Sequence, residues 1–311
     1  MVRLLKTSME LTAGLLLTAV LALAQTQGQM GRPGMVNYVE GQVSVDGQLV
    51  ANSQVGQLEV APGQVLRTDS GKAEMLLTPG VFLRLEAHSA VRMVSPSLTD
   101  TRVELLQGEA MVEADQVEKE NRLAVLDHGA TITLEKHGIY QFNADNPKVA
   151  VYDGKAQVQQ DDRTKDVGKG EQLSLVQNPK LKTESFDRHH EDDLYAWSKL
   201  RSEYTSQANM ASAQTIVTAD PWWWYGTGWY WSPWFDSWAF VPGGGFLYSP
   251  FGFGFYSPGY WGAYRAGYFG SRRGYGGRAF VPAFHGAAMG GFRGGMGGFH
   301  GGMGGFHGGR R

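Results

Sequence analysis

The sequence contains no cysteine among its 311 residues. This absence excludes disulfides, thiolate metal sites, a cysteine nucleophile and the lipid-modified cysteine of a lipoprotein. Any stable domain in the chain must therefore rest on its hydrophobic core, without covalent cross-links.

Acidic residues are absent after Asp236, although the same stretch carries seven arginines. The whole chain has a formal net charge of −2, so the part before this stretch carries −9. Such a division is typical of segments with separate tasks. Glycine dominates the basic end, and Gly-Gly-Phe-x-Gly-Gly-x repeats from Gly290 onward. We expect residues 271–311 to form a Gly-rich, disordered basic tail, because glycine loses the most backbone freedom on folding.

Long apolar runs are scarce, and the one that qualifies stands near the beginning. Arg3 and Lys6 precede an apolar run from Leu11 to Leu23, and Ala22-Leu23-Ala24 has the small-x-small form of a cleavage site. The run is shorter than the roughly 20 residues of a spanning helix. We expect a signal peptide over 1–24 and a linker over 25–34, with export to the periplasm or cell surface. An uncleaved membrane anchor is the alternative.

Short alternating units fill residues 35–177. Two patterns recur: Gly-x-Val/Ala-x-Val begins at Gly41, Gly108 and Gly154, and Val-x-x-Gly-x-x-Leu begins at Val60 and Val167. Apolar side chains two residues apart share one face of a strand. The units therefore predict an all-β domain, either a sandwich or a small β-solenoid-like fold.

The same alternation predicts which side chains form the core of this domain. The expected interior residues are Val43, Val45, Leu83, Leu85, Ala110, Val112, Val151 and Val158. Arg84 lies between two of them, so we expect it to point away from the core and outward.

In this order, the units resemble the FecR family of bacterial envelope proteins. The resemblance is carried by Val-Glu-Gly-Gln-Val at 39–43 and by segments 62–68, 71–77, 83–85, 89–93, 105–110, 149–154 and 168–173. It implies a non-enzymatic, all-β periplasmic domain over 35–177 that works through protein contacts. The best-known members also have a cytoplasmic segment that controls a sigma factor. Only ten residues precede the apolar run here, so we expect this chain to lack that role.

Residues 178–211 are expected to form a linker and an amphipathic helix, with the helical pattern running from about 185 to 211. Five residues recur at helical spacing on one face: Leu194, Trp197, Leu200, Arg201 and Tyr204. Acidic residues precede them, where the helix dipole favours negative charge. We expect this face to dock the helix on the β-domain or on the aromatic segment that follows.

Eight of the nine tryptophans lie in an aromatic segment over 212–270. They are Trp222, Trp223, Trp224, Trp229, Trp231, Trp234, Trp238 and Trp261. Three interpretations stay open: a self-packing or assembly surface, a membrane-interface anchor, and a glycan- or ligand-binding module. Few polar residues are interleaved with the tryptophans, which favours attachment to a surface or partner. The segment has enough aromatic residues to collapse. Because it is also rich in Gly and Pro, we expect it not to form a regular sheet.

We expect the chain to divide near residue 212 and to leave a protease-resistant fragment from about 35 to about 210.

The residues that carry chemistry are scattered. His189 and His190 are neighbours, and adjacent side chains on a helix diverge, so we interpret them as a solvated helix start. The sequence has no nucleophile motif and no phosphate-binding loop. We therefore predict no enzyme, no cofactor and no metal, and weak copper binding by the His and Met residues of the tail stays an alternative. Arg-Gly-Gly runs are typical of nucleic-acid-binding tails, but export argues against nucleic acid. An envelope protein or a surface polymer is the expected partner, and the oligomeric state stays open.

Overall fold

The computed structural model describes residues 31–176, 180–219 and 226–263. The predicted signal peptide, the basic tail and Trp222, Trp223 and Trp224 lie outside these ranges, so the hypotheses about them stay predictions.

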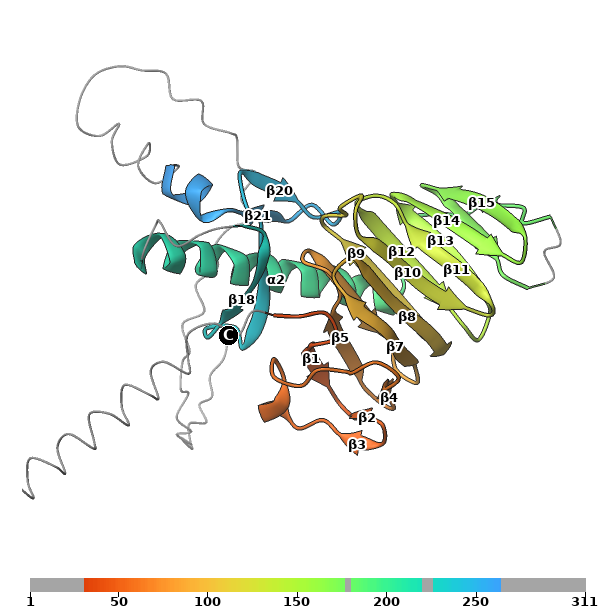
Figure 1. The fold of residues 1–311 in the computed structure, drawn as a ribbon, viewed down its shortest axis with the longest axis horizontal. Helices are drawn as coiled ribbons and strands as arrows, with labels where there is room; N and C mark the ends of the chain where they lie inside the picture. The colour runs from red at the N-terminus through yellow and green to blue at the C-terminus, as the bar shows by residue number, and fades with distance from the viewer. Residues whose placement is uncertain (1–30, 177–179, 220–225, 264–311) are drawn as a thin grey trace, which may run out of the picture. The chain divides into compact units, whose positions relative to one another are not determined.

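The β-domain consists of two open sheets (Figure 1). The eight-stranded sheet has the order β1 (Val36–Glu40), β5 (Lys72–Leu76), β6 (Val81–Leu85), β9 (Glu109–Ala114), β12 (Gly138–Asn143), β13 (Lys148–Asp153), β16 (Glu171–Ser174) and β17 (Glu184–Ser185). The nine-stranded sheet has the order β15 (Arg163–Gly168), β14 (Lys155–Gln160), β11 (Ala130–Leu134), β10 (Arg122–Asp127), β8 (Asp100–Gln107), β7 (Ala90–Ser97), β4 (Val65–Thr68), β2 (Val43–Val45) and β3 (Gln48–Leu49). The short 3-10 turn η1 (Asn52–Gln54) follows β3.

The chain alternates between the two sheets as it advances. It places β5 and β6 in one sheet, β7 and β8 in the other, then returns for β9, and the same exchange continues to β16. Figure 1 shows the colour progressing along both sheets from orange at β1–β5 to green at β14–β15. The all-β prediction is confirmed. The fold is a two-sheet sandwich in which successive strands are added in one direction, as in a solenoid.

The predicted core is confirmed, because all eight expected interior residues belong to the cluster between the sheets. Their exposed fractions do not exceed 6%. Arg84, the polar residue between Leu83 and Leu85, only partly follows the prediction. Arg84 does leave this core for the other face of its strand, but it is 0% exposed. The prediction that it faces outward to solvent is therefore wrong, because the outer face of β6 is covered.

Glycine fixes the entry into the repeated strands. Gly41, Gly108 and Gly154 have φ values of +65°, +73° and +99°, a region that side chains with a Cβ rarely adopt. A Cβ on Gly108 would also clash with Ser89 Oγ. The recurring glycine is thus required by backbone geometry at the turn before each strand.

The rest of the described chain covers the outer face of the eight-stranded sheet. Helix α2 (Asp193–Ala219) contacts β6 and β9, and it also contacts β18 (Gly228–Ser232), β19 (Ser237–Val241) and β21 (Gly254–Tyr256). β18 pairs with β19, and β20 (Phe246–Tyr248) pairs with β21, as two antiparallel hairpins. In the described residues, no helix is long and apolar enough to cross a membrane.

Two details differ from the sequence-based expectation. The helix begins at Asp193 and continues to Ala219, rather than ending near 211. The aromatic segment also forms regular hairpins in its described part, because its glycines and prolines fall mostly between the strands. The described packing therefore continues past residue 212.

Candidate functional site: the covered face of the eight-stranded sheet

Three neighbouring strands place charged side chains on the covered face of the sheet. Glu74 on β5 is directly opposite Arg84 on β6, and Glu113 on β9 lies on the next strand. All three side chains are 0% exposed. A sheet face with such residues is expected to be solvated, since buried charges are costly unless they are paired. Here the pairing partners come from the sheet itself and from α2.

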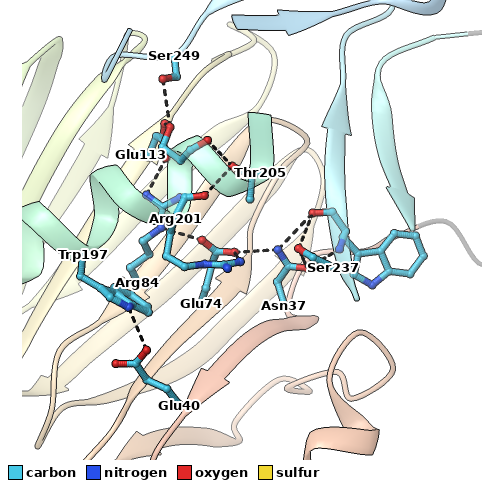
Figure 2. Close-up of polar contacts among 12 residues, drawn as sticks. Asn37, Glu40, Glu74, Arg84, Glu113, Trp197, Arg201, Thr205, Ser237 and Ser249 are labelled. Atoms are coloured by element: carbon cyan, nitrogen blue, oxygen red, sulfur yellow. Dashed lines mark hydrogen bonds and ion pairs between the residues drawn. The ribbon is translucent and has the colours of Figure 1, made fainter. Parts of the chain in front are cut away.

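Figure 2 shows the network that results. Arg84 Nε donates to Glu74 Oε2 at 2.8 Å, and Arg84 Nη1 lies 2.6 Å from Glu113 Oε2. From the helix, Arg201 Nη2 donates to Glu74 Oε1 at 2.9 Å, and Ser202 donates its hydroxyl to Glu113. The Arg201 guanidinium also lies 4.0 Å from the centre of the Tyr38 ring. Two guanidiniums and two carboxylates thus compensate one another beneath the helix.

The electrostatics of this network hold Glu74 in its ionised form. Burial alone would raise the pKa of Glu74, but the guanidiniums of Arg201 and Arg84 outweigh it and lower the pKa to about 2. Burial lowers the pKa of Arg84, and the carboxylates of Glu113 and Glu74 raise it by more. Glu74 and Arg84 therefore stay ionised across the ordinary pH range.

A fifth ionisable group, Asp115, lies at the end of β9 and is 4% exposed. Burial raises its pKa well above the ordinary value, and the neighbouring charge of Glu113 raises it further. Both of its carboxyl oxygens are buried without a hydrogen-bond partner among the described groups. Burial and the neighbouring Glu113 carboxylate thus both disfavour the charged form of Asp115.

The buried face of α2 is polar, which the sequence pattern did not indicate. Leu194 and Arg201 are buried as expected, and Trp197 is partly buried. Leu200 and Tyr204 are 48% and 47% exposed, so their assignment to the docking face is wrong. Small polar residues occupy that face instead: Ser198, Ser202, Thr205, Ser206, Asn209 and Ser212. The helix docks through hydrogen bonds to the sheet and hairpins, and apolar contact plays a smaller part than predicted.

The start of α2 is fixed by one carboxylate. Asp192 Oδ1 accepts a hydrogen bond from the Tyr195 backbone N–H at 2.8 Å, which caps the helix. Its other oxygen, Oδ2, accepts from Gln141 Nε2 on β12 at 2.7 Å. The cap therefore also ties the first helical turn to the sheet.

Two buried asparagines join the aromatic hairpins to this layer. Asn37 on β1 accepts from the Trp238 backbone N–H at 2.7 Å and donates to Glu74 Oε1 at 2.8 Å. Asn209 on α2 donates to the carbonyl oxygens of Phe240 at 2.8 Å and Tyr256 at 3.1 Å, and accepts from the Tyr256 N–H at 2.8 Å. Because β19 and β21 both bond to Asn209, one side chain holds both hairpins.

The structure separates the predicted tryptophan cluster into two groups. Trp229 and Trp238 are each 2% exposed and pack with Phe82, Phe240 and other apolar residues against the sheet. Trp238 Nε1 donates to the Gly56 carbonyl at 2.8 Å. These two side chains are interior residues and do not lie at a surface that a partner or glycan can reach.

The remaining described tryptophans differ in how far they are exposed. Trp234, in the turn between β18 and β19, is 83% exposed, and Trp231 is 36% exposed with its ring edge against Trp238. Trp261 packs against Tyr256 and is partly buried. The structure thus does not assemble the described tryptophans into one platform.

The second hairpin has an exposed aromatic surface that the count of tryptophans missed. Phe246 is 44% exposed and Tyr248 is 56% exposed, with ring centroids 5.7 Å apart. The Tyr260 ring lies tilted against Phe246, with centroids 4.9 Å apart. The signal for it was the spacing of Phe246 and Tyr248, two residues apart on one strand face.

The chemistry of these groups is that of binding and support. Arg84 and Arg201 are held in ion pairs, so they are not free to act on a substrate. Among the described residues, no group of three or more His, Asp or Glu side chains is placed to hold a metal ion. His189 and His190 lie just before α2.

Residues 64–157 match the family model described as FecR protein. The chain carries a FecR domain. The match falls inside the predicted range of 35–177 and covers β4 to β13 completely. The FecR resemblance and the all-β fold that it implied are therefore confirmed, and β1, α2 and the hairpins lie outside the matched residues.

Two solved structures described as a "putative anti-sigma factor from Parabacteroides distasonis ATCC 8503" are also similar to this chain. They share 17% and 16% sequence identity with it, with TM-scores of 0.34 and 0.33. Each covers 44% of this chain, which in turn spans 62% and 64% of theirs, less than two thirds in both cases. No curated protein matches the sequence.

Proposed function

We propose that this protein is a non-catalytic, exported scaffold of the cell envelope, in which the FecR domain provides protein contacts. The aromatic segment after α2 would attach it to an envelope protein or a surface polymer. Family membership supports a regulatory or binding role over an enzymatic one. The apolar N-terminal run and its small-x-small site support export.

The observation that carries the attachment role is the exposure of Trp234. Its hairpin is anchored from below by Trp229 and Trp238, both of which are 2% exposed. The turn that they anchor presents Trp234 with 83% of its surface exposed. A large apolar side chain held in water contributes little to the fold, whereas tryptophan is enriched at binding hot spots. The hairpin is thus anchored to the sheet by its buried tryptophans and leaves Trp234 exposed for contact with a partner.

The alternative, a glycan- or ligand-binding module built from the tryptophan cluster, has less support. A platform built from the tryptophan cluster requires several aromatic faces that are accessible together. Trp229 and Trp238 are interior, and Trp231 uses its ring against Trp238. Attachment through Trp234 requires no such platform.

Fractionation of native cells tests the proposal. We expect the full-length protein in the envelope fraction and Trp234→Ala shifted toward the soluble fraction. Leu98→Ala is the matched control, because Leu98 is 50% exposed in the turn between β7 and β8 of the FecR domain. It should fractionate as the wild type does. A wild-type protein that stays wholly soluble in the periplasm would overturn the attachment role, and recovery in the cytoplasm would overturn export.

A further inference from the structure

A cleft of about 410 Å³ opens on the outer face of the eight-stranded sheet, beside the start of α2. Strands β9, β12, β13 and β16 form its floor, and the segment from Phe186 to Asp192 forms one side. The volume lies within the range of small-ligand sites, about 300–1,000 Å³. The attachment role of Trp234 does not use this cleft.

The floor of the cleft holds a carboxylate in a fixed orientation. Asn143 Nδ2 donates to Glu109 Oε1, and Gln141 Nε2 donates to Glu109 Oε2 at 3.1 Å. The same Gln141 nitrogen donates to Asp192 Oδ2 at 2.7 Å. Two carboxylates from distant parts of the chain are thus brought to one amide, and both line the cleft.

One wall of the cleft is aromatic. Tyr152 and Phe186 both line it, and their ring centroids are 4.9 Å apart in an edge-to-face arrangement. Tyr195 packs on the other side of Tyr152, with centroids 4.9 Å apart. The wall is therefore supported from behind and presents apolar surface next to the two carboxylates.

The charge of the lining is negative. Glu109, Asp187 and Asp192 line the cleft together with Lys148 and His190. Burial raises the pKa of Glu109, and the charge of Asp192 raises it further, against the opposing effect of Lys148. A cation placed between the two carboxylates would relieve this repulsion, while an anion would increase it.

Arginine matches these features better than other cationic side chains. Its planar guanidinium has five N–H donors in a fixed fork and can donate to two carboxylates together. It also stacks on aromatic rings, which a strongly hydrated ammonium does less well. We propose that this cleft binds the guanidinium of an arginine in an extended, glycine-flanked basic peptide. The chain carries such peptides itself, for example Phe292-Arg293-Gly294-Gly295.

The probe is a synthetic peptide of the sequence Gly-Gly-Phe-Arg-Gly-Gly, titrated into the full-length protein by calorimetry. A second peptide carries citrulline in place of arginine, which keeps the shape of the side chain and removes its charge. We expect the citrulline peptide to bind about tenfold or more weakly, as for loss of a charged hydrogen-bonding group. Equal binding of the two peptides, or no binding of the arginine peptide, would overturn the proposal.

Variants of the protein locate the binding. Glu109→Gln and Asp192→Asn each remove a charge from the cleft, and asparagine caps a helix as well as aspartate does. Each should weaken the arginine peptide about tenfold. Glu104→Gln makes the same change in the exposed ion pair with Arg92 on the nine-stranded sheet, and it should change the affinity less than twofold. Phe186→Leu tests the aromatic wall without a change of charge. Thermal melts of all the variants show whether each one folds. If all variants bind as the wild type does, the peptide binds elsewhere and the proposal fails.

A final arm distinguishes the source of the arginine. The seven arginines after Asp236 are replaced by glutamine in the full-length chain. Tighter binding of the added peptide to this variant shows that the chain's own arginines compete for the cleft. Unchanged, citrulline-sensitive binding assigns the cleft to an arginine of another chain.

Discussion

Arg84 Nε donates to Glu74 Oε2 at 2.8 Å, directly across two neighbouring strands, and neither side chain is exposed. Both residues lie within the matched FecR domain, whereas Arg201, which completes the bonding of Glu74, belongs to α2 beyond it. A buried carboxylate of this kind requires all its partners. The FecR domain and the helix that follows it therefore pack together in one compact unit.

Removal of Arg84 should be far more damaging than removal of an exposed arginine. We expect Arg84→Met to lower the free energy of unfolding by about 3–5 kcal/mol, because it leaves Glu74 and Glu113 buried with fewer partners. Arg92→Met is the matched control, since Arg92 also pairs with a glutamate on the next strand, with side chains 43% and 36% exposed. That variant should lose at most about 1 kcal/mol. Urea denaturation measures both, and equal losses would show that Arg84 is not buried by α2.

Asp115 should make the stability depend on pH in the direction opposite to a paired carboxylate. Its pKa is raised in the folded state by burial first and then by Glu113, with Arg84 opposing. A raised pKa contributes stability that is present below the unfolded value of 3.8 and is lost as pH rises toward the folded value. Asp115→Asn cannot ionise, so it should gain stability relative to the wild type as pH rises. Urea unfolding between about pH 4 and pH 8 tests this, and parallel curves for the two proteins would contradict it.

The core assignment predicts a large loss at Leu85 and a small one at Leu49. Leu85 is 0% exposed between the sheets, and Leu49 is 69% exposed on an edge strand. Leu85→Ala should cost about 2–5 kcal/mol through lost burial and the cavity that it leaves. Leu49→Ala should stay within about 0.5 kcal/mol. A loss below half a kilocalorie per mole at Leu85 would show that the strand register is wrong.

The core between the sheets was predictable because one side of most strands is apolar. Alternation assigns Val43, Leu85 and Val112 to the core correctly, since side chains two residues apart lie on the same face of a strand. The outer face was not predictable in this way. In the sequence, Glu74, Arg84 and Glu113 look like solvated positions. Arg201, the partner of Glu74, lies 127 residues after it, and Ser202, the partner of Glu113, lies 89 residues after it. Pairing at such separation leaves no local pattern.

The docking of α2 at the candidate site was also not predictable from the sequence pattern. An apolar stripe through Leu200 and Tyr204 indicates a docking face, but the described helix docks through Ser202, Ser206 and Asn209. Small polar residues on a helix are ordinarily solvated, so the sequence favours the wrong side. Only the carbonyl groups of β19 and β21, which the hairpins bring close, make a buried Asn209 favourable.

Asn209 should therefore control the docking of both hairpins. Asn209→Ala leaves the Phe240 and Tyr256 carbonyls and the Tyr256 N–H without this partner, at about 1–3 kcal/mol for each group that stays buried. Gln207→Ala is the control, because Gln207 is exposed on the same helix. Tryptophan fluorescence during urea unfolding reports on the buried Trp229 and Trp238. We expect an earlier transition for Asn209→Ala alone, and the same midpoint in both variants would refute the link.

Limited proteolysis tests whether the chain divides near residue 212, as its composition predicts, or beyond the hairpins. The sequence has no lysine or arginine between Arg201 and Arg265, so trypsin distinguishes the two divisions cleanly. Because Arg201 is bonded to Glu74 and Asn209 holds both hairpins, we expect the resistant fragment to end at or after Arg265. Its mass should then include the aromatic hairpins. In Asn209→Ala, the loosened layer should let trypsin cut at Lys199 sooner than in the wild type. Early cutting at Lys199 in both proteins would mean that the helix and hairpins separate readily from the FecR domain, and the division near residue 212 would then stand.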